Sequence, residues 1–93
     1  SNLILNVSEL RYYTQQVQLF PNPTADCLNV NVFEPIQSYS LVDMNGEIVK
    51  FEFVSQFFSS KLMINISDLD SGLYMLLIQL INNKIVTKRV YKQ

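Results

Sequence analysis

The sequence predicts an all-β protein, a seven-stranded antiparallel β-sandwich of immunoglobulin-like architecture. Three observations lead to this fold class. Ile, Val, Leu, Tyr and Phe dominate the apolar residues while alanine occurs once, and this composition favours strands over helices. Short runs of alternating apolar and polar residues recur between turn-forming residues, and none shows the 3.6-residue period of a helix. At 93 residues the chain can build one hydrophobic core but not two.

The first two predicted strands are Thr14–Phe20 and Cys27–Phe33. In both, apolar and polar residues alternate, as in strands that bury one face. The residues predicted to point inward are Val17 and Leu19 in the first strand, and Leu28, Val30 and Val32 in the second. Pro21 and Pro23 separate the two strands, because each removes a backbone donor and fixes φ, so that the chain must turn there or cross between sheets.

The third and fourth predicted strands, Ile36–Val42 and Glu47–Val54, form a hairpin. Asn45-Gly46 lies between them, and this pair is a strong hairpin signal because a type I′ turn needs positive φ at both central positions. Pro35 separates the hairpin from the preceding strand. Because the chain has only two glycines, we expect both to occupy backbone conformations that require glycine.

The last three predicted strands are Lys61–Ile66, Leu73–Ile81 and Lys84–Tyr91. The first alternates, with Leu62, Ile64 and Ile66 pointing inward. The second is apolar on both faces, which is typical of a central strand that the opposing sheet covers on one side and that is partly shielded on the other. The second glycine, Gly72, precedes this strand, and a turn at Asn82-Asn83 follows it.

The charge of the chain is unevenly distributed. The net charge is only -1, so no overall basic field attracts nucleic acid or an anionic membrane. However, all eight acidic residues lie within residues 1–70, whereas residues 71–93 carry only basic ones. These are Lys84, Lys88, Arg89 and Lys92. This basic end is either a recognition element or a set of solvated side chains that guard an edge strand.

The sequence predicts no catalytic, cofactor or metal site. Without histidine, Ser-His-Asp and Cys-His arrangements are excluded, and Cys27 alone offers neither a disulfide nor a zinc site. Asp68-Leu69-Asp70-Ser71-Gly72 resembles the start of a calcium loop but lacks its later ligands. We expect side-chain oxygens of this segment to cap a turn instead. No run of about 18 apolar residues occurs that could span a membrane.

Residues 1–16 are predicted to be a linker or the tail of a preceding cargo domain, and residues 17–93 the β-domain. Leu3, Leu5 and Val7 alternate, so residues 1–13 could instead supply an extra edge strand. The chain begins at Ser1-Asn2 without methionine, and we therefore expect a fragment of a longer protein.

Five motifs occur in a fixed order within the predicted β-domain: Leu19–Thr24, Leu28-Asn29-Val30, Val42–Val49, Ile66–Tyr74 and Lys88–Gln93. Together they resemble the C-terminal sorting domain, type A, of the type IX (Por) secretion system. The resemblance covers roughly residues 17–93. It departs from the family pattern at Val90, where an aromatic residue is frequent, and at Tyr91, where an aliphatic residue is common.

This resemblance implies a secretion signal and not an enzyme. Such a domain is fused to an N-terminal cargo protein, which reaches the periplasm of a Gram-negative bacterium through a separate signal. The type IX translocon of the outer membrane then recognises the domain. A sortase-like peptidase removes it upstream of Pro21, as the cargo is secreted or attached to the cell surface. The resemblance implies no cofactor.

We assign signal recognition, as a hypothesis, to the basic end of the last strand, which can offer main-chain pairing together with charge. Its residues are Lys88, Arg89, Val90, Tyr91 and Lys92. The residues expected to define the fold are Pro21, Asn22, Pro23, Asn45, Gly46, Ser71, Gly72 and Tyr74. The alternative function is a non-catalytic immunoglobulin-like adhesion or carbohydrate-binding module that binds through Phe57-Phe58 or Tyr39.

Overall fold

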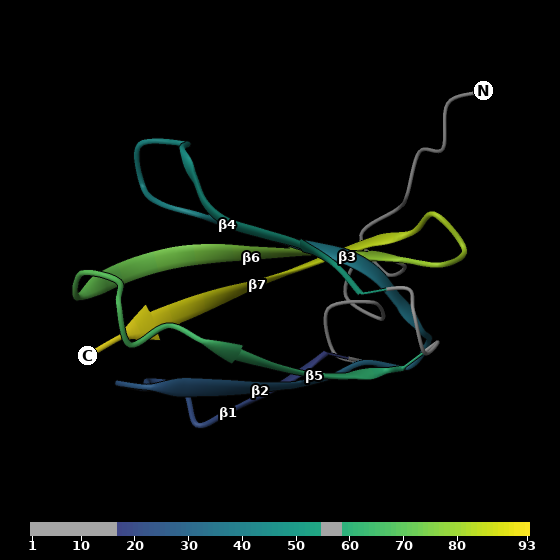
Figure 1. Cartoon of the computed structure of the whole chain (residues 1–93), viewed down its shortest axis with the longest axis horizontal. Coiled ribbons are helices and arrows are strands. Elements are labelled where there is room, and N and C mark those ends of the chain that lie inside the picture. The colour runs from purple at the N-terminus through teal and green to yellow at the C-terminus, as the bar shows by residue number, and fades with distance from the viewer. Residues whose placement is uncertain (1–16, 55–58) are drawn as a thin grey trace, which may run out of the picture.

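The structure, a computed structural model, describes residues 17–54 and 59–93, and it consists of two antiparallel sheets packed face to face (Figure 1). One sheet has the order β1-β2-β5 and the other the order β4-β3-β6-β7. The strands are β1 (Gln18–Phe20), β2 (Cys27–Asn31), β3 (Ile36–Val42), β4 (Ile48–Phe53), β5 (Lys61–Asn65), β6 (Gly72–Leu80) and β7 (Ile85–Lys92). The predicted all-β sandwich is confirmed. The described residues contain no helix that could cross a membrane.

The hydrophobic core lies between the two sheets. Leu28, Val30 and Ile64 from the three-stranded sheet face Leu76 and Ile78 of β6, and all five are at most 1% exposed. Each such burial contributes about 1.5–3 kcal/mol to the free energy of folding. The inward residues predicted from the alternation are confirmed, with Leu19 and Leu62 partly buried against the core.

The sixth strand is the interior strand of its sheet, as its two apolar faces predicted. It pairs with β3 on one side and with β7 on the other. Its even-numbered residues from Tyr74 to Leu80 are buried in the core, and on the outer face Leu73 and Leu77 are half-buried while Met75 is 37% exposed.

The first two strands are shorter than predicted. β1 begins at Gln18, and residues 14–16 of the predicted strand lie outside the described residues. β2 ends at Asn31, after which the Val32 N–H still donates to Ser60 O at 2.9 Å. The chain then bends through residues 33–35 into the other sheet, where Pro35 has no N–H to continue a ladder.

The turn between β3 and β4 differs from the predicted type I′ turn. Its Gly46 N–H donates to Asp43 O at 3.1 Å, and Gly46 has φ of 84°, whereas Asn45 does not have positive φ. The prediction of positive φ at both residues is therefore wrong. The Asp43 Oδ1 accepts from the N–H of Asn45 and of Glu47, both at 2.9 Å, and this Asx-type capping favours an ordinary turn followed by a left-handed glycine.

The turn between β6 and β7 repeats this design with asparagine in place of glycine. The Asn83 N–H donates to Leu80 O at 2.9 Å, and Asn83 has φ of 69°. The Leu80 N–H donates to Lys84 O at 2.8 Å, as the Asp43 N–H does to Glu47 O in the first turn. Asparagine tolerates this conformation better than most residues other than glycine.

The turn that precedes β6 is capped by Asn65 and not by the aspartates that follow it. The Asn65 Oδ1 accepts from the Ser67 N–H at 2.9 Å and from the Ser67 hydroxyl at 2.7 Å. Asp68 forms an ion pair with Lys50 at 3.4 Å instead. Gly72 then enters β6 with φ of 149°, a conformation that favours glycine. Within the described ranges, no group of three acidic, cysteine or histidine residues is placed to hold a metal ion.

Candidate functional site

The segment between β1 and β2 lies along the outer edge of β7. Thr24 forms a parallel bridge with Lys92. The Thr24 N–H donates to Tyr91 O at 3.0 Å, and the Gln93 N–H donates to Thr24 O at 2.8 Å. The first and the last of the sequence motifs are therefore in direct contact, and the segment connects the three-stranded sheet to the end of the other sheet.

Asn22 extends this contact through its side chain. Its Nδ2 donates to Arg89 O at 3.0 Å, and its Oδ1 accepts from the Tyr91 N–H at 3.0 Å. The carboxamide thus bonds one carbonyl and one N–H of β7, as a neighbouring strand would. Asn22 and Thr24 thus share four hydrogen bonds with Arg89, Tyr91 and Gln93. We call this set of four hydrogen bonds the edge clasp.

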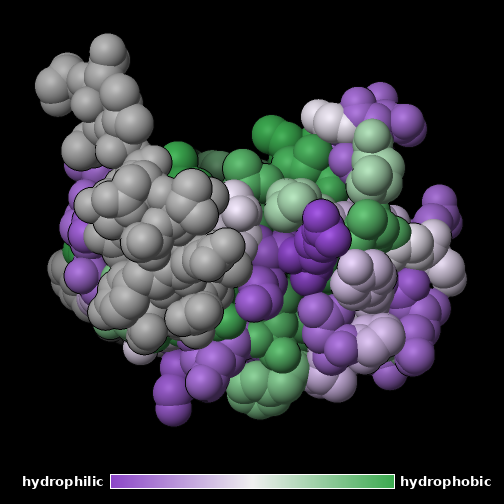
Figure 2. Space-filling view, turned by 180° about the vertical axis from the view of Figure 1, so that it is seen from behind, coloured by the Kyte–Doolittle hydropathy of each residue, from purple (hydrophilic) through white to green (hydrophobic). Residues whose placement is uncertain are grey.

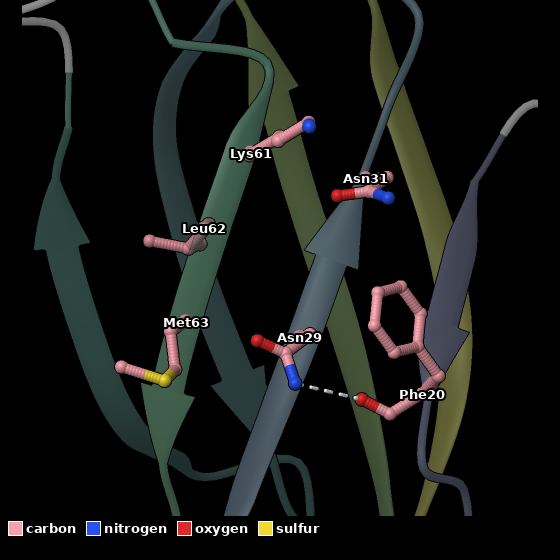
Figure 3. A pocket seen from close by; sticks show the side chains of 6 residues that line it. All are labelled: Phe20, Asn29, Asn31, Lys61, Leu62 and Met63. Atoms are coloured by element: carbon pink, nitrogen blue, oxygen red, sulfur yellow. Dashed lines mark hydrogen bonds between the residues drawn. The ribbon is translucent and has the colours of Figure 1, made fainter.

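The edge clasp is held in place by bonds to the three-stranded sheet. Thr24 is 3% exposed, and its hydroxyl donates to Cys27 O at 2.9 Å. The Asn29 Nδ2 donates to Phe20 O at 3.3 Å (Figure 3). The peptide bonds before Pro21 and Pro23 are both cis. The hydrogen bonds of Phe20 O and of the Thr24 hydroxyl thus fix the chain on both sides of the two prolines.

Three motifs that are far apart in the sequence meet at this end of the sandwich, beside the C label in Figure 1. Gly72, at the start of β6, pairs with Lys92, to which Thr24 also forms its bridge. Val42, next to the β3–β4 turn, pairs with Met75. The predicted fold-defining residues of the first and fourth motifs therefore lie at the end of the last strand, whereas the β3–β4 turn with Asn45 and Gly46 lies apart from the C label in Figure 1.

Tyr74 closes the turn that precedes β6. Its hydroxyl donates to Asp70 O at 2.7 Å. Desolvation raises the pKa of Tyr74 above its usual value, and the carboxylates of Asp70 and Asp43 add to this effect. The phenol therefore stays neutral and remains a hydrogen-bond donor at neutral pH.

The predicted recognition residues do not share one environment. Val90 is fully buried, so it stabilises the core and cannot contact a partner of the folded domain. Lys88 and Lys92, on the same side of β7, are half-buried. Arg89 is exposed and Tyr91 is 45% exposed on the opposite, outer side.

Lys88, Arg89 and Tyr91 line a shallow groove of about 460 Å³ beside the edge clasp. Its lining residues are Asn22, Met75, Thr87, Lys88, Arg89 and Tyr91. Two are cationic and none is acidic, while Met75 and Tyr91 supply apolar surface. The groove is therefore suited to a segment that carries both a carboxylate and an apolar side chain. The roles of Asn22, Met75 and Thr87 here follow from contacts between distant segments, which sequence patterns do not reveal.

A second hollow of about 370 Å³ lies on the outer face of the three-stranded sheet (Figure 3). It is lined by Phe20, Asn29, Asn31, Lys61, Leu62 and Met63. Lys61 is its one charged residue, and it lies on a different sheet from the basic end of β7. Lys61 and Met63 are therefore useful positions for control substitutions.

Tyr39, which the alternative function uses as a binding residue, is buried. It is 4% exposed, and its hydroxyl donates to the Glu52 Oε1 at 3.0 Å. Burial, together with this bond and the charge of Glu52, raises the pKa of Tyr39 above its usual value. Tyr39 therefore cannot stack on a ligand at the surface, and Phe57-Phe58 lie outside the described residues.

The chain is thus a small β-sandwich module in which the end of the last strand is bonded to the segment between β1 and β2. A family model described as the secretion system C-terminal sorting domain matches residues 18–92, and the chain belongs to this family. It is a C-terminal sorting signal of the type IX secretion system, which implies contact with the secretion machinery and export to the cell surface or secretion. A search of curated proteins gives no match.

Proposed function

We propose that the chain is the type A form of this sorting domain, and that it acts as the recognised signal and not as a catalyst. The order of the five motifs supports the subtype, and the lack of histidine supports the non-catalytic role. Residues 17–93 form the signal, and residues 1–16 are a linker or the tail of a fused N-terminal cargo. The cargo passes through the periplasm before it meets the translocon.

A sortase-like peptidase removes the domain after export, by cleavage upstream of Val17. This placement is supported by the packing of the first described residues. Val17 is 3% exposed, and Gln18, Leu19 and Phe20 pair with β2. A protease needs an extended segment whose main chain is free, and pairing with β2 holds the main chain of Gln18–Phe20 in the sheet although two of its side chains are exposed.

The translocon contacts the basic end of β7 through Lys88, Arg89, Tyr91 and Lys92. The observation that carries this proposal is the groove beside the edge clasp, where the two cations meet apolar surface without any acidic residue. The edge clasp already occupies the main chain of β7 from residue 89 onward. The contact therefore uses side chains and charge, and the main-chain pairing expected at this edge is not part of the proposal.

The test is export of a fluorescent reporter fused to residues 14–93 in a strain with the type IX system. Arg89→Glu is expected to lower export about tenfold, which corresponds to about 1.4 kcal/mol of binding free energy. Lys61→Glu is the matched control, because it makes the same change of charge at an exposed lysine of the other sheet. Equal export of the two variants would contradict the proposed role of Arg89.

A further inference from the structure

The fourth strand exposes large apolar side chains. Ile48, Phe51 and Phe53 are 62%, 49% and 72% exposed. The rings of Phe51 and Phe53 meet edge to face with their centroids 4.8 Å apart. In Figure 1 the β3–β4 hairpin bends away from the three-stranded sheet, and in Figure 2 hydrophobic surface lies beside this hairpin at the upper right. Clustered apolar surface of this kind marks interaction sites.

In the part of the chain that the structure describes, the main chain of β4 is also unpaired along its outer edge. The Val54 N–H donates to Gln37 O at 2.7 Å, and the register pairs Phe53 with Ser38. Because hydrogen-bonded and non-bonded pairs alternate in an antiparallel ladder, the N–H and C=O of Phe51 and Phe53 point away from β3. Within residues 17–54 and 59–93 no strand pairs with this edge.

The other sheet edges are protected or short. The edge clasp covers the end of β7, and β1 has only three residues. β5 exposes one large apolar residue, Met63, which lies between exposed polar neighbours on its face at Lys61 and Asn65. β4 differs from all three, because it combines a free main chain with clustered aromatic rings. Natural proteins usually block such an edge.

The charged residues of β4 do not block it. Glu52 accepts the hydroxyl of Tyr39, and Lys50 pairs with Asp68 at 3.4 Å. Lys50 and Glu52 pair with Leu41 and Tyr39, so their side chains lie on the face of β4 opposite the two rings. The face that carries the rings has no charged residue of β4, which favours an uncharged, apolar partner segment.

We propose that the free edge of β4 is a docking surface for an extended segment of the type IX machinery with apolar side chains at alternate positions. The segment pairs with the main chain of Phe51 and Phe53 and packs against their rings, as in β-strand addition. This inference rests on the proposed function, in which the machinery recognises the folded domain. It adds a second contact, which is less sensitive to salt than the basic groove.

The first test replaces both rings, Phe51→Thr with Phe53→Thr, in the reporter fusion. Threonine retains strand propensity while removing the apolar surface. Export is expected to fall about tenfold, a loss of about 1.4 kcal/mol of binding free energy. Met63→Thr is the matched control, because Met63 is 67% exposed on another edge strand, and its export should equal that of the parent. Unchanged export of the double variant in its folded state, checked by circular dichroism, would overturn the proposal.

The second test does not depend on how the double variant folds. A photo-crosslinking amino acid at Phe53 of the otherwise unchanged fusion is irradiated in cells, and adducts are identified by mass spectrometry. An adduct with an outer-membrane component of the type IX machinery is expected, with none from the same group at Met63. No adduct, equal adducts at both positions, or an adduct only with a second copy of the chain would overturn the proposal.

The two contacts can be judged separately. If Arg89→Glu is exported normally while the Phe51→Thr, Phe53→Thr variant is not, only the proposed role of the basic groove fails. The reverse result overturns only the β4 surface. Raised ionic strength in a binding assay with purified machinery should weaken the contact at Arg89 and leave the β4 contact nearly unchanged.

Discussion

Asn22 acts in place of a missing strand neighbour at the edge of β7. Asn22→Ala removes both of its hydrogen bonds and is expected to lower the free energy of unfolding by about 1–2 kcal/mol. Asn22→Asp should cost at least as much, because a carboxylate cannot donate to Arg89 O. Urea unfolding measures both changes. Asn31→Ala, at a carboxamide on the outer face of β2, is the control and should stay within about 0.5 kcal/mol of the parent.

Asn83 offers a stabilising substitution. Its φ of 69° is unfavourable for most side chains, whereas glycine adopts this conformation freely. Asn83→Gly is therefore expected to raise the free energy of unfolding by about 0.5–1 kcal/mol. Gly46→Ala, at φ of 84°, should lower it by a similar amount. If Asn83→Gly and Gly46→Ala shift the thermal unfolding temperature in the same direction, the left-handed conformation is not the cause of these stability changes.

At the scale of strands, the two edges of the four-stranded sheet should differ in hydrogen exchange. The Tyr91 N–H is bonded to Asn22 and should exchange slowly although it lies on an edge. The N–H groups of Phe51 and Phe53 face away from β3, and they should exchange about tenfold faster than that of Val54, which donates to Gln37 O. Amide exchange followed by NMR checks this pattern, and Asn22→Ala should accelerate exchange at Tyr91 without affecting β4.

The strands themselves could be predicted, because alternation in the sequence reports directly which face is buried. All seven strands occur where the pattern places them, apart from differences of a few residues at their ends, and the apolar outer face of β6 correctly indicated an interior strand. The type of turn at Asn45-Gly46 could not be read from this pair alone. The same pair fits two turns, and the Asp43 side chain, which bonds two N–H groups, favours the one that forms.

At the scale of the whole molecule, the last strand supports the fold as well as the proposed signal. Deleting residues 88–93 removes the buried Val90, the pairing with Gly72 and Tyr74, and the edge clasp. We expect this deletion to unfold the domain, seen as loss of the cooperative thermal transition. Failed export of the deleted form would then not identify a recognition residue. A deleted form that still unfolds cooperatively near the parent temperature would contradict this expectation.

The meeting of the three motifs at the end of β7 could not be predicted from the sequence. Each motif has a local explanation, as a turn or as a strand end, and local patterns contain no information on which turns become neighbours. The contact between Asn22 and β7 joins residues 67 and 69 positions apart. The charge pattern indicates the basic end, but the burial of Val90 within it depends on the sheet order. The apolar surface of β4 depends on the sheet order as well, because the alternation of Phe51 and Phe53 fits either a core face or an interface.

The edge clasp also sets an order of events during folding. A chain that emerges or is threaded with its N-terminus first presents Asn22 and Thr24 long before their partners in β7 arrive. Closing a loop of nearly 70 residues is among the slower steps available to a small domain. We therefore expect the clasp to close late, after β7 has joined the sheet. The clasp therefore closes only in a domain whose whole chain has been synthesised or transported. In a chain that stops before β7, this end of the domain would stay open to proteases.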